Sequence, residues 1–227
     1  MAEKYLMSLM TRGGKLRVPA WVLNHKAFLK WIRSGAVPEE VRVEYIRNEV
    51  WIDPMPERAF AHNQIKTLVA SMLMPLVRRE KLGVYFGDGM LFTSETEQFS
   101  TTPDGLFASR ASIDTDRVRL KGGKRGHRDT ELIGIPDLVV EVVSDSSADD
   151  DTEWLMTKYW NVGIPEYWVI DGRAGPIRFT IYRHGEKGYT AVRKAEGWSA
   201  SPVLGRQFRF VPVEKQMGHP ACDFEVR

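Results

Sequence analysis

The chain has 227 residues, of which 43% are hydrophobic and 27% are charged, and its formal net charge at pH 7 is +2. This composition is typical of a folded globular protein and excludes a disordered or fibrous chain. The nearly balanced charge neither requires nor excludes a nucleic-acid partner. No apolar run reaches the ~18 residues that cross a bilayer, and the first residues lack the pattern of a signal peptide. The single cysteine, Cys222, cannot form an intramolecular disulfide, which fits a reducing setting. Together these features lead us to expect a cytoplasmic protein without a membrane partner.

The predicted elements begin with an N-terminal helical lead-in over residues 1–40. Residues 10–19 are basic and contain glycine, which favours a loose segment. Residues 21–32 space their apolar side chains at helical intervals, and Gly35 can end that helix. The remainder of the chain, residues 41–227, is expected to form a single domain.

A hairpin and a long helix are predicted next. Residues 41–46 alternate polar and apolar side chains as strands do, and residues 50–52 form the expected return strand after a turn at 47–49. Residues 62–80 carry an apolar stripe at i, i+3, i+4 and i+7, which predicts an amphipathic helix. Pro75 is expected to kink or break this helix.

The second half of the chain predicts strands mixed with a helix. Short strands between residues 84 and 107 precede the most apolar strand, which covers residues 137–143. A helix over 149–162 and a strand over 166–170 complete a unit typical of a right-handed crossover. A hairpin follows over residues 177–192. The order favours an α/β fold with a sheet of mixed direction.

Glu141 is the most informative residue of the sequence, because it lies among valines within the most apolar strand. A carboxylate there is costly unless it is paired, hydrogen-bonded or bound to a metal. A structural ion pair and a functional role carry equal weight on this evidence. Asp104 either belongs to an ordinary Pro-Asp-Gly turn or joins Glu141 in binding Mg²⁺ or Mn²⁺, which prefer oxygen ligands. Such an ion can activate water and stabilise charge on a phosphate.

Further candidates are basic. His62 could be a general base, a metal ligand or a polar residue at a helix start, and the last is the commonest role of a lone histidine. Lys158 could orient an attacking water or lie solvated on its helix. A basic run over residues 117–128 could contact a phosphate backbone or form a soluble loop. The candidate nucleic-acid contacts in this run are Arg119, Lys121, Lys124 and Arg125.

Two stretches of the chain resemble the Uma-two family of restriction-endonuclease-like proteins, in the PD-(D/E)XK nuclease superfamily: IPDLVVEVVSDSS and KYWNVGIPEYWVID. The resemblance runs from about residue 41 to about residue 211, and residues 136–171 are its most specific part. Glu44 in the first hairpin, His62 at the start of the long helix, and Pro103-Asp104 are also similar to the family's motifs.

The resemblance implies a restriction-endonuclease-like core, which is a mixed β-sheet flanked by helices. It also implies that Asp104 and Glu141 hold Mg²⁺ (or Mn²⁺), with Glu44 and His62 nearby. The sequence departs from the superfamily at the usual lysine position two residues after the glutamate, which is Val143. The family's alternative position in the following helix is Leu155, and Lys158 lies about one turn beyond it.

Two functions are therefore predicted as alternatives. The first is a metal-dependent endonuclease that hydrolyses DNA phosphodiester bonds, with Lys158 placing the water and His62 moving a proton. The second is a degenerate nuclease-fold module that binds nucleic acid or a protein partner without cutting. A homodimer would provide two symmetric sites for cleavage of both strands.

Overall fold

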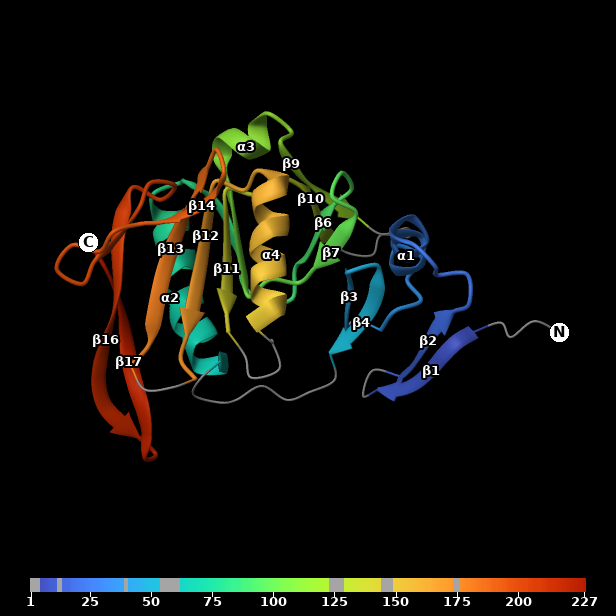
Figure 1. Ribbon diagram of the computed structural model, residues 1–227, viewed down its shortest axis with the longest axis horizontal. Coiled ribbons are helices and arrows are strands. Elements are labelled where there is room, and N and C mark those ends of the chain that lie inside the picture. Colours follow the sequence, from blue (N-terminus) through green and yellow to red (C-terminus); the bar gives the residue numbers. More distant parts are fainter. Residues whose placement is uncertain are drawn as a thin grey trace. The chain divides into compact units, whose positions relative to one another are not determined.

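The structure is a computed structural model, and its described part consists of residues 5–11, 14–38, 41–53, 62–122, 129–143, 149–173 and 176–227. The chain divides into two compact units, and most of their elements are labelled in Figure 1. Unit 1 comprises residues 1–56, 89–102 and 119–134, and unit 2 comprises residues 57–88, 103–118 and 135–227. Among the described residues, none of the helices is both long and apolar enough to cross a membrane.

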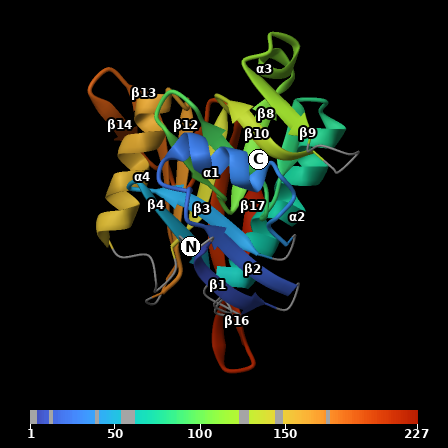
Figure 2. The ribbon, with the colours of Figure 1, turned by 90° about the vertical axis from the view of Figure 1, so that its right-hand side faces the viewer.

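Unit 1 contains helix α1 (His25–Ile32) and an antiparallel pair of strands, β1 (Tyr5–Thr11) and β2 (Gly14–Pro19) (Figure 2). A larger sheet has the strand order β4-β3-β7-β6-β10-β9. Its strands are β3 (Arg42–Ile46), β4 (Glu49–Asp53), β6 (Leu91–Ser94), β7 (Phe99–Thr101), β9 (Val118–Gly122) and β10 (Asp129–Gly134). The predicted first hairpin is confirmed, with Ile46 paired to Glu49 across a two-residue turn.

The N-terminal residues contribute to the core of unit 1. The prediction of a loose segment over residues 10–19 is wrong, because residues 14–19 form β2 and its Leu16 and Val18 side chains are buried. Helix α1 begins later than predicted, at the point where the Asn24 side chain accepts a hydrogen bond from the backbone N–H of Ala27. The buried cluster that results also includes side chains of the first hairpin: Leu16, Val18, Val22, Phe28, Leu29, Trp31, Val43 and Tyr45. The proposed division at residue 40 stays a prediction.

His25 gives unit 1 a predicted dependence on pH. Its ring is buried, its Nε2 lies 2.9 Å from the Ser100 hydroxyl, and burial together with the charge of Arg33 lowers its pKa from 6.5 to about 4. Because the folded state disfavours the charged form of His25, acid lowers the free energy of unfolding. The stability is fully present above the unfolded pKa of 6.5 and is lost as the pH falls towards 4. The slope should be at most about 1.4 kcal/mol per pH unit.

Denaturant unfolding of the wild type and of His25→Gln from neutral pH down to the lower of these pKa values measures this contribution. Gln keeps a hydrogen-bonding group near Ser100 but does not titrate. The wild type should lose stability more steeply with acid than the variant. Parallel stability curves for the two proteins would show that protonation of His25 is not coupled to unfolding.

Unit 2 contains a second mixed sheet with the order β14-β13-β12-β11-β8-β5. Its strands are β5 (Gly83–Phe86), β8 (Gly105–Ser109), β11 (Leu138–Val142), β12 (Glu166–Asp171), β13 (Arg178–Gly185) and β14 (Gly188–Ala191). Strands β11 and β12 are parallel and the other neighbouring pairs are antiparallel, which confirms the predicted mixed direction. A separate three-stranded sheet has the order β15-β16-β17, formed by β15 (Ser199–Ser201), β16 (Arg206–Gln216) and β17 (His219–Val226).

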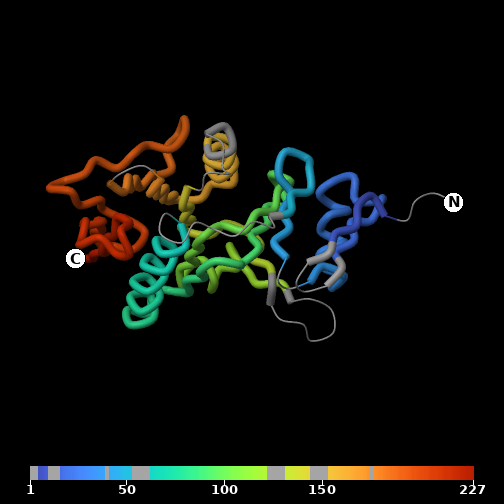
Figure 3. Tube along the Cα trace, turned by 90° about the horizontal axis from the view of Figure 1, so that it is seen from below, coloured from blue at the N-terminus to red at the C-terminus, as the bar shows by residue number. Residues whose placement is uncertain are grey.

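Helices cover both faces of the mixed sheet of unit 2. Helix α2 (Gln64–Arg79) and helix α4 (Asp149–Val162) lie on opposite sides of its strands (Figure 3). The short helix α3 (Arg110–Asp114) follows β8. The α2 side is the main core, in which Val69 and Leu73 pack with Leu138, Val140 and other buried apolar side chains of the sheet. The predicted break at Pro75 does not occur, because α2 continues through it to Arg79.

Candidate active site

Asp104 and Glu141 come at the same end of the neighbouring strands β8 and β11. These strands are antiparallel, and the last pair in their register is Val140 with Gly105. The next residues along the two strands are Glu141 and Asp104, so the register places them at facing positions. Oδ2 of Asp104 also accepts a hydrogen bond of 2.7 Å from the backbone N–H of Val142. The side-chain oxygen thus takes the place of a backbone carbonyl of a neighbouring strand. This bond ties the Asp104 side chain to the strand that carries Glu141.

Glu141 is held by a tyrosine from α4. The Tyr159 hydroxyl donates a hydrogen bond of 2.6 Å to Oε1 of Glu141, and the Tyr159 side chain is fully buried. The Tyr159 ring packs edge-on against Tyr167 of β12, with the ring centroids 5.2 Å apart. The alternation of side chains along β11 puts Glu141 on the α4 side of the sheet, opposite the side on which Val140 packs in the core. Glu141 is therefore oriented by a neutral hydroxyl that is itself fixed by packing.

Two buried tyrosines lie within the electrostatic influence of Asp104 or Glu141. Tyr167 is fully buried, and burial raises the pKa of its hydroxyl well above the usual value. The charges of Glu141 and Asp104 raise that pKa further, so both carboxylates act on the same phenol. Burial and the charge of Asp104 also raise the pKa of Tyr85 on β5.

Two basic side chains reach Asp104 from the beginning of α2. His62 Nε2 lies 3.5 Å from Oδ2 of Asp104, and Lys66 Nζ lies 3.5 Å from Oδ1. His62 and Lys66 are four residues apart, so they lie on one face of the helix. His62 therefore stands close to Asp104, as the resemblance implied.

Lys66 was missed by the sequence analysis. Its ammonium also pairs with Oδ2 of Asp88 at 2.8 Å, and its side chain is 7% exposed. The signal was present, because Lys66 precedes Val69 and Leu73 by three and seven residues and so belongs to the buried face of the helix. A lysine at such a position usually extends its ammonium to solvent, and for this reason the sequence alone did not single it out.

Glu44 lies on β3 in unit 1, whereas Asp104 and Glu141 belong to unit 2. Its Oε1 accepts hydrogen bonds from the backbone N–H of Thr102 at 2.6 Å and from the Thr101 hydroxyl at 3.2 Å. These contacts fix the end of β7 to β3. A role for Glu44 in the chemistry stays a prediction.

Lys158 lies on α4 beside Tyr159. Its Nζ is 5.7 Å from the centroid of the Trp154 ring, which is one turn earlier on the same helix. The side chains of consecutive residues in an α-helix point about 100° apart around the helix axis. The side chains of Lys158 and Tyr159 therefore leave the helix on different faces. The role of Lys158 in orienting a water also stays a prediction.

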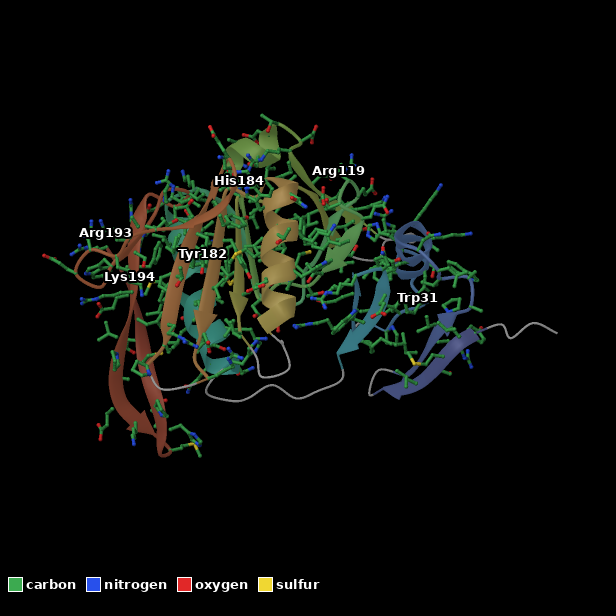
Figure 4. All side chains as sticks on the ribbon, in the orientation of Figure 1. Trp31, Arg119, Tyr182, His184, Arg193 and Lys194 are labelled. Atoms are coloured by element: carbon green, nitrogen blue, oxygen red, sulfur yellow. The ribbon has the colours of Figure 1, made fainter. Side chains whose placement is uncertain are left out.

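The candidate nucleic-acid contacts are only partly described. Arg119 is exposed on β9 (Figure 4) and Lys121 is half-buried on the same strand, whereas Lys124 and Arg125 lie outside the described residues. Arg117, at the start of the same basic run, instead pairs with Asp137, whose side chain is largely buried. Part of the basic run is therefore structural.

The chemistry of Asp104 and Glu141 suits a hard divalent cation. Each carboxylate offers several lone pairs, so the hydrogen bonds of Asp104 and Glu141 leave room for a metal–oxygen bond. Within the described ranges there is no cluster of three or more His, Cys, Asp or Glu side chains that could hold a metal. Mg²⁺ needs no such cluster, since it commonly binds through one or two carboxylates together with water and substrate phosphate. The residues present fit Mg²⁺ better than Zn²⁺, which takes nitrogen and sulfur ligands in closed sites.

Comparisons with known proteins place the chain in a family. A family model described as "Putative restriction endonuclease" matches residues 26–214. No curated protein matches the chain. The fold is similar to that of a crystal structure described as "a putative nuclease belonging to DUF820" from Anabaena variabilis ATCC 29413, with 19% identity and a TM-score of 0.59 over 80% of this chain and 90% of that one. The prediction of an α/β nuclease-like fold, with mixed sheets flanked by helices, is confirmed, and the chain belongs to the Uma2 family, the Uma-two family that its motifs predict.

Proposed function

We propose that this protein is a nuclease that uses a divalent cation, Mg²⁺ or Mn²⁺, to hydrolyse phosphodiester bonds of DNA. The observation that supports it most is the facing position of Asp104 and Glu141 at one end of β8 and β11. Membership in a family described as restriction endonucleases supports the same reaction class. Two carboxylates from adjacent strands suit a cation that must also accept a phosphate oxygen.

The proposed site residues have distinct tasks. Asp104 and Glu141 would hold the cation, and Tyr159 would keep Glu141 in position. A divalent cation supplies Lewis acidity, which makes water more acidic and offsets the negative charge that develops on the phosphate. His62, 3.5 Å from Asp104, would move a proton at its Nε2.

The reaction is a hydrolysis without a redox step. The water oxygen forms a bond to phosphorus and one bond between phosphorus and a sugar oxygen breaks. The water loses a proton, and the leaving sugar oxygen gains one. Arg119 and Lys121, together with Lys124 and Arg125, would contact the DNA backbone.

A second candidate function is a module of the same fold that binds nucleic acid or a protein partner without cutting it. Val143 favours it, because this buried side chain occupies the position at which the superfamily usually has lysine. Leu155, at the family's alternative position, is also apolar. The two functions make different predictions about the effect of a divalent cation.

Incubation of the purified protein with supercoiled plasmid and with a linear duplex, in Mg²⁺, Mn²⁺ or EDTA, separates the two functions. We expect cleavage with Mg²⁺ or Mn²⁺ and intact DNA with EDTA. Salt-sensitive retention of DNA without cleavage in any cation would contradict the nuclease and support the binding module.

Tyr159→Phe tests the placement of Glu141. The variant keeps the ring and its packing but removes the hydroxyl that donates to Glu141. A hydrogen bond to a charged group contributes about 1.5–3 kcal/mol to stability, so the free energy of unfolding should fall by up to this amount. Cleavage should be about 10- to 100-fold slower, because Glu141 loses the hydroxyl that orients it.

Tyr189→Phe is the matched control. Its hydroxyl donates a 2.8 Å hydrogen bond to the carbonyl oxygen of Ile164 and not to a carboxylate. Single-turnover cleavage should be unchanged in this variant. Equal rates in both variants would mean that Tyr159 does not position the site.

A further inference from the structure

Lys66 is a buried cation with two carboxylate neighbours. Its Nζ lies 2.8 Å from Oδ2 of Asp88 and 3.5 Å from Oδ1 of Asp104, and its side chain is 7% exposed. A buried ammonium is costly unless it is paired, and both neighbours contribute to its compensation. The packing of Ile65 and Val69 in the core holds the helix, and with it the base of the Lys66 side chain.

The two carboxylates differ in their exposure to solvent. Asp104 is 5% exposed, and its Oδ2 is bound to the backbone N–H of Val142 at 2.7 Å. Asp88 follows β5 in a turn, and its side chain is 39% exposed. Of these two carboxylates, Asp88 is therefore the one whose place beside Lys66 an anion from solvent can reach.

A phosphate oxygen is suited to that replacement. It carries negative charge and accepts hydrogen bonds from an ammonium, as the Asp88 carboxylate does. A phosphate on a cation held by Asp104 would also bring its oxygens close to Lys66, since Nζ is 3.5 Å from Oδ1 of Asp104. If a phosphate oxygen replaces the Asp88 carboxylate, the Lys66 ammonium keeps an anionic partner.

We propose that Lys66 binds an oxygen of the scissile phosphate, and that Asp88 is the counter-ion that this phosphate displaces. The inference rests on the proposed nuclease function. The two positions at which a lysine is expected hold Val143 and Leu155, and Lys66 on α2 would supply the positive charge in their place. Lys66 remains an ammonium during the reaction, and it stabilises the negative charge that grows on the phosphate in the transition state. Asp88 limits DNA binding by competing for Lys66.

The test compares Lys66→Met and Asp88→Asn with the control Lys187→Met in the full-length protein. Lys187 is an exposed lysine in the turn between β13 and β14. Single-turnover cleavage is measured in Mg²⁺ or Mn²⁺, and duplex binding is measured in Ca²⁺ over a range of salt. Lys66→Met should slow cleavage about 100-fold or more and reduce the slope of log affinity against log salt by about one. Asp88→Asn should bind the duplex several-fold more tightly, since it removes a charge that repels DNA. Lys187→Met should match the wild type in rate.

The outcomes separate this inference from the proposed function. If the wild type cleaves and Lys66→Met cleaves at an equal rate with an equal salt slope, the role of Lys66 is wrong and the nuclease stands. If the wild type binds DNA without cutting it in any cation, the nuclease is wrong, and an unchanged salt slope in Lys66→Met would overturn this inference as well. If Lys66→Met does not fold, Asp88→Asn still tests the proposal, because Asp88 is exposed. Weaker or unchanged duplex binding by Asp88→Asn would overturn the claim that phosphate displaces Asp88 from Lys66. A wild type that does not bind the duplex overturns both proposals.

Discussion

Glu141→Gln should lower the rate of metal-dependent DNA cleavage by about 100- to 1,000-fold. The substitution keeps the size of the side chain and an oxygen that can accept the hydrogen bond from Tyr159. It removes the negative charge that a hard cation requires of its ligand. The fold should persist, because an amide of the same size replaces a partly exposed carboxylate and creates no cavity.

Glu166→Gln is the matched control for Glu141→Gln. Glu166 lies on the neighbouring strand β12, is 1% exposed, and accepts hydrogen bonds from Trp168 and Ser201. Burial raises its pKa, so it too is a perturbed carboxylate in the same sheet. It pairs with Leu138, whose side chain faces away from Glu141. Cleavage should be unchanged in this control, and equal loss in both variants would mean that Glu141 affects activity only through the fold.

Arg33→Met should destabilise unit 1 by about 3–5 kcal/mol. The Nε and Nη2 atoms of Arg33 each lie 2.8 Å from an oxygen of Glu131, whose side chain is 3% exposed. Removal of the guanidinium leaves the buried carboxylate without this partner. Denaturant unfolding should show the loss, and the double variant Arg33→Met, Glu131→Gln should recover part of it.

Arg206→Met provides the comparison for Arg33→Met. Arg206 pairs with Glu80 at 2.7 Å, but the two side chains are 39% and 23% exposed. An ion pair in contact with solvent contributes about 1 kcal/mol or less. Similar losses for Arg206→Met and Arg33→Met would refute the claim that burial makes the Arg33 pair important.

The sequence was most informative where the hydrophobic pattern was strong and local. The runs at 137–143 and 166–170 are apolar enough to require burial, and they correspond to the parallel strands β11 (Leu138–Val142) and β12 (Glu166–Asp171). The predicted helix over 149–162 is α4. The valines around Glu141 also identified it as an unusual carboxylate. Such patterns alone do not determine how neighbouring strands are aligned. The facing positions of Asp104 and Glu141 could therefore be recognised only from the register of β8 and β11 in the structure.

The errors have physical causes as well. Residues 14–19 seemed loose because basic side chains alternate with Leu16 and Val18, yet the alternation is that of a strand with one buried face. The pairing of Lys66 with Asp88 and Asp104 joins separate stretches of the chain, so no local pattern could indicate it. Glu44 is a different case. It was assigned by resemblance, its Oε1 accepts hydrogen bonds from Thr101 and Thr102, and its role in the chemistry stays a prediction.

The most direct test of the central claim is the nicking of supercoiled plasmid by the wild-type protein while its cation is removed and returned. We expect nicking in Mn²⁺ or Mg²⁺ that stops when EDTA is added in excess and resumes at the same rate when the cation is restored. That result would establish a nuclease that depends reversibly on a divalent cation. Plasmid that stays supercoiled in every cation, or nicking that continues in EDTA, would contradict the account.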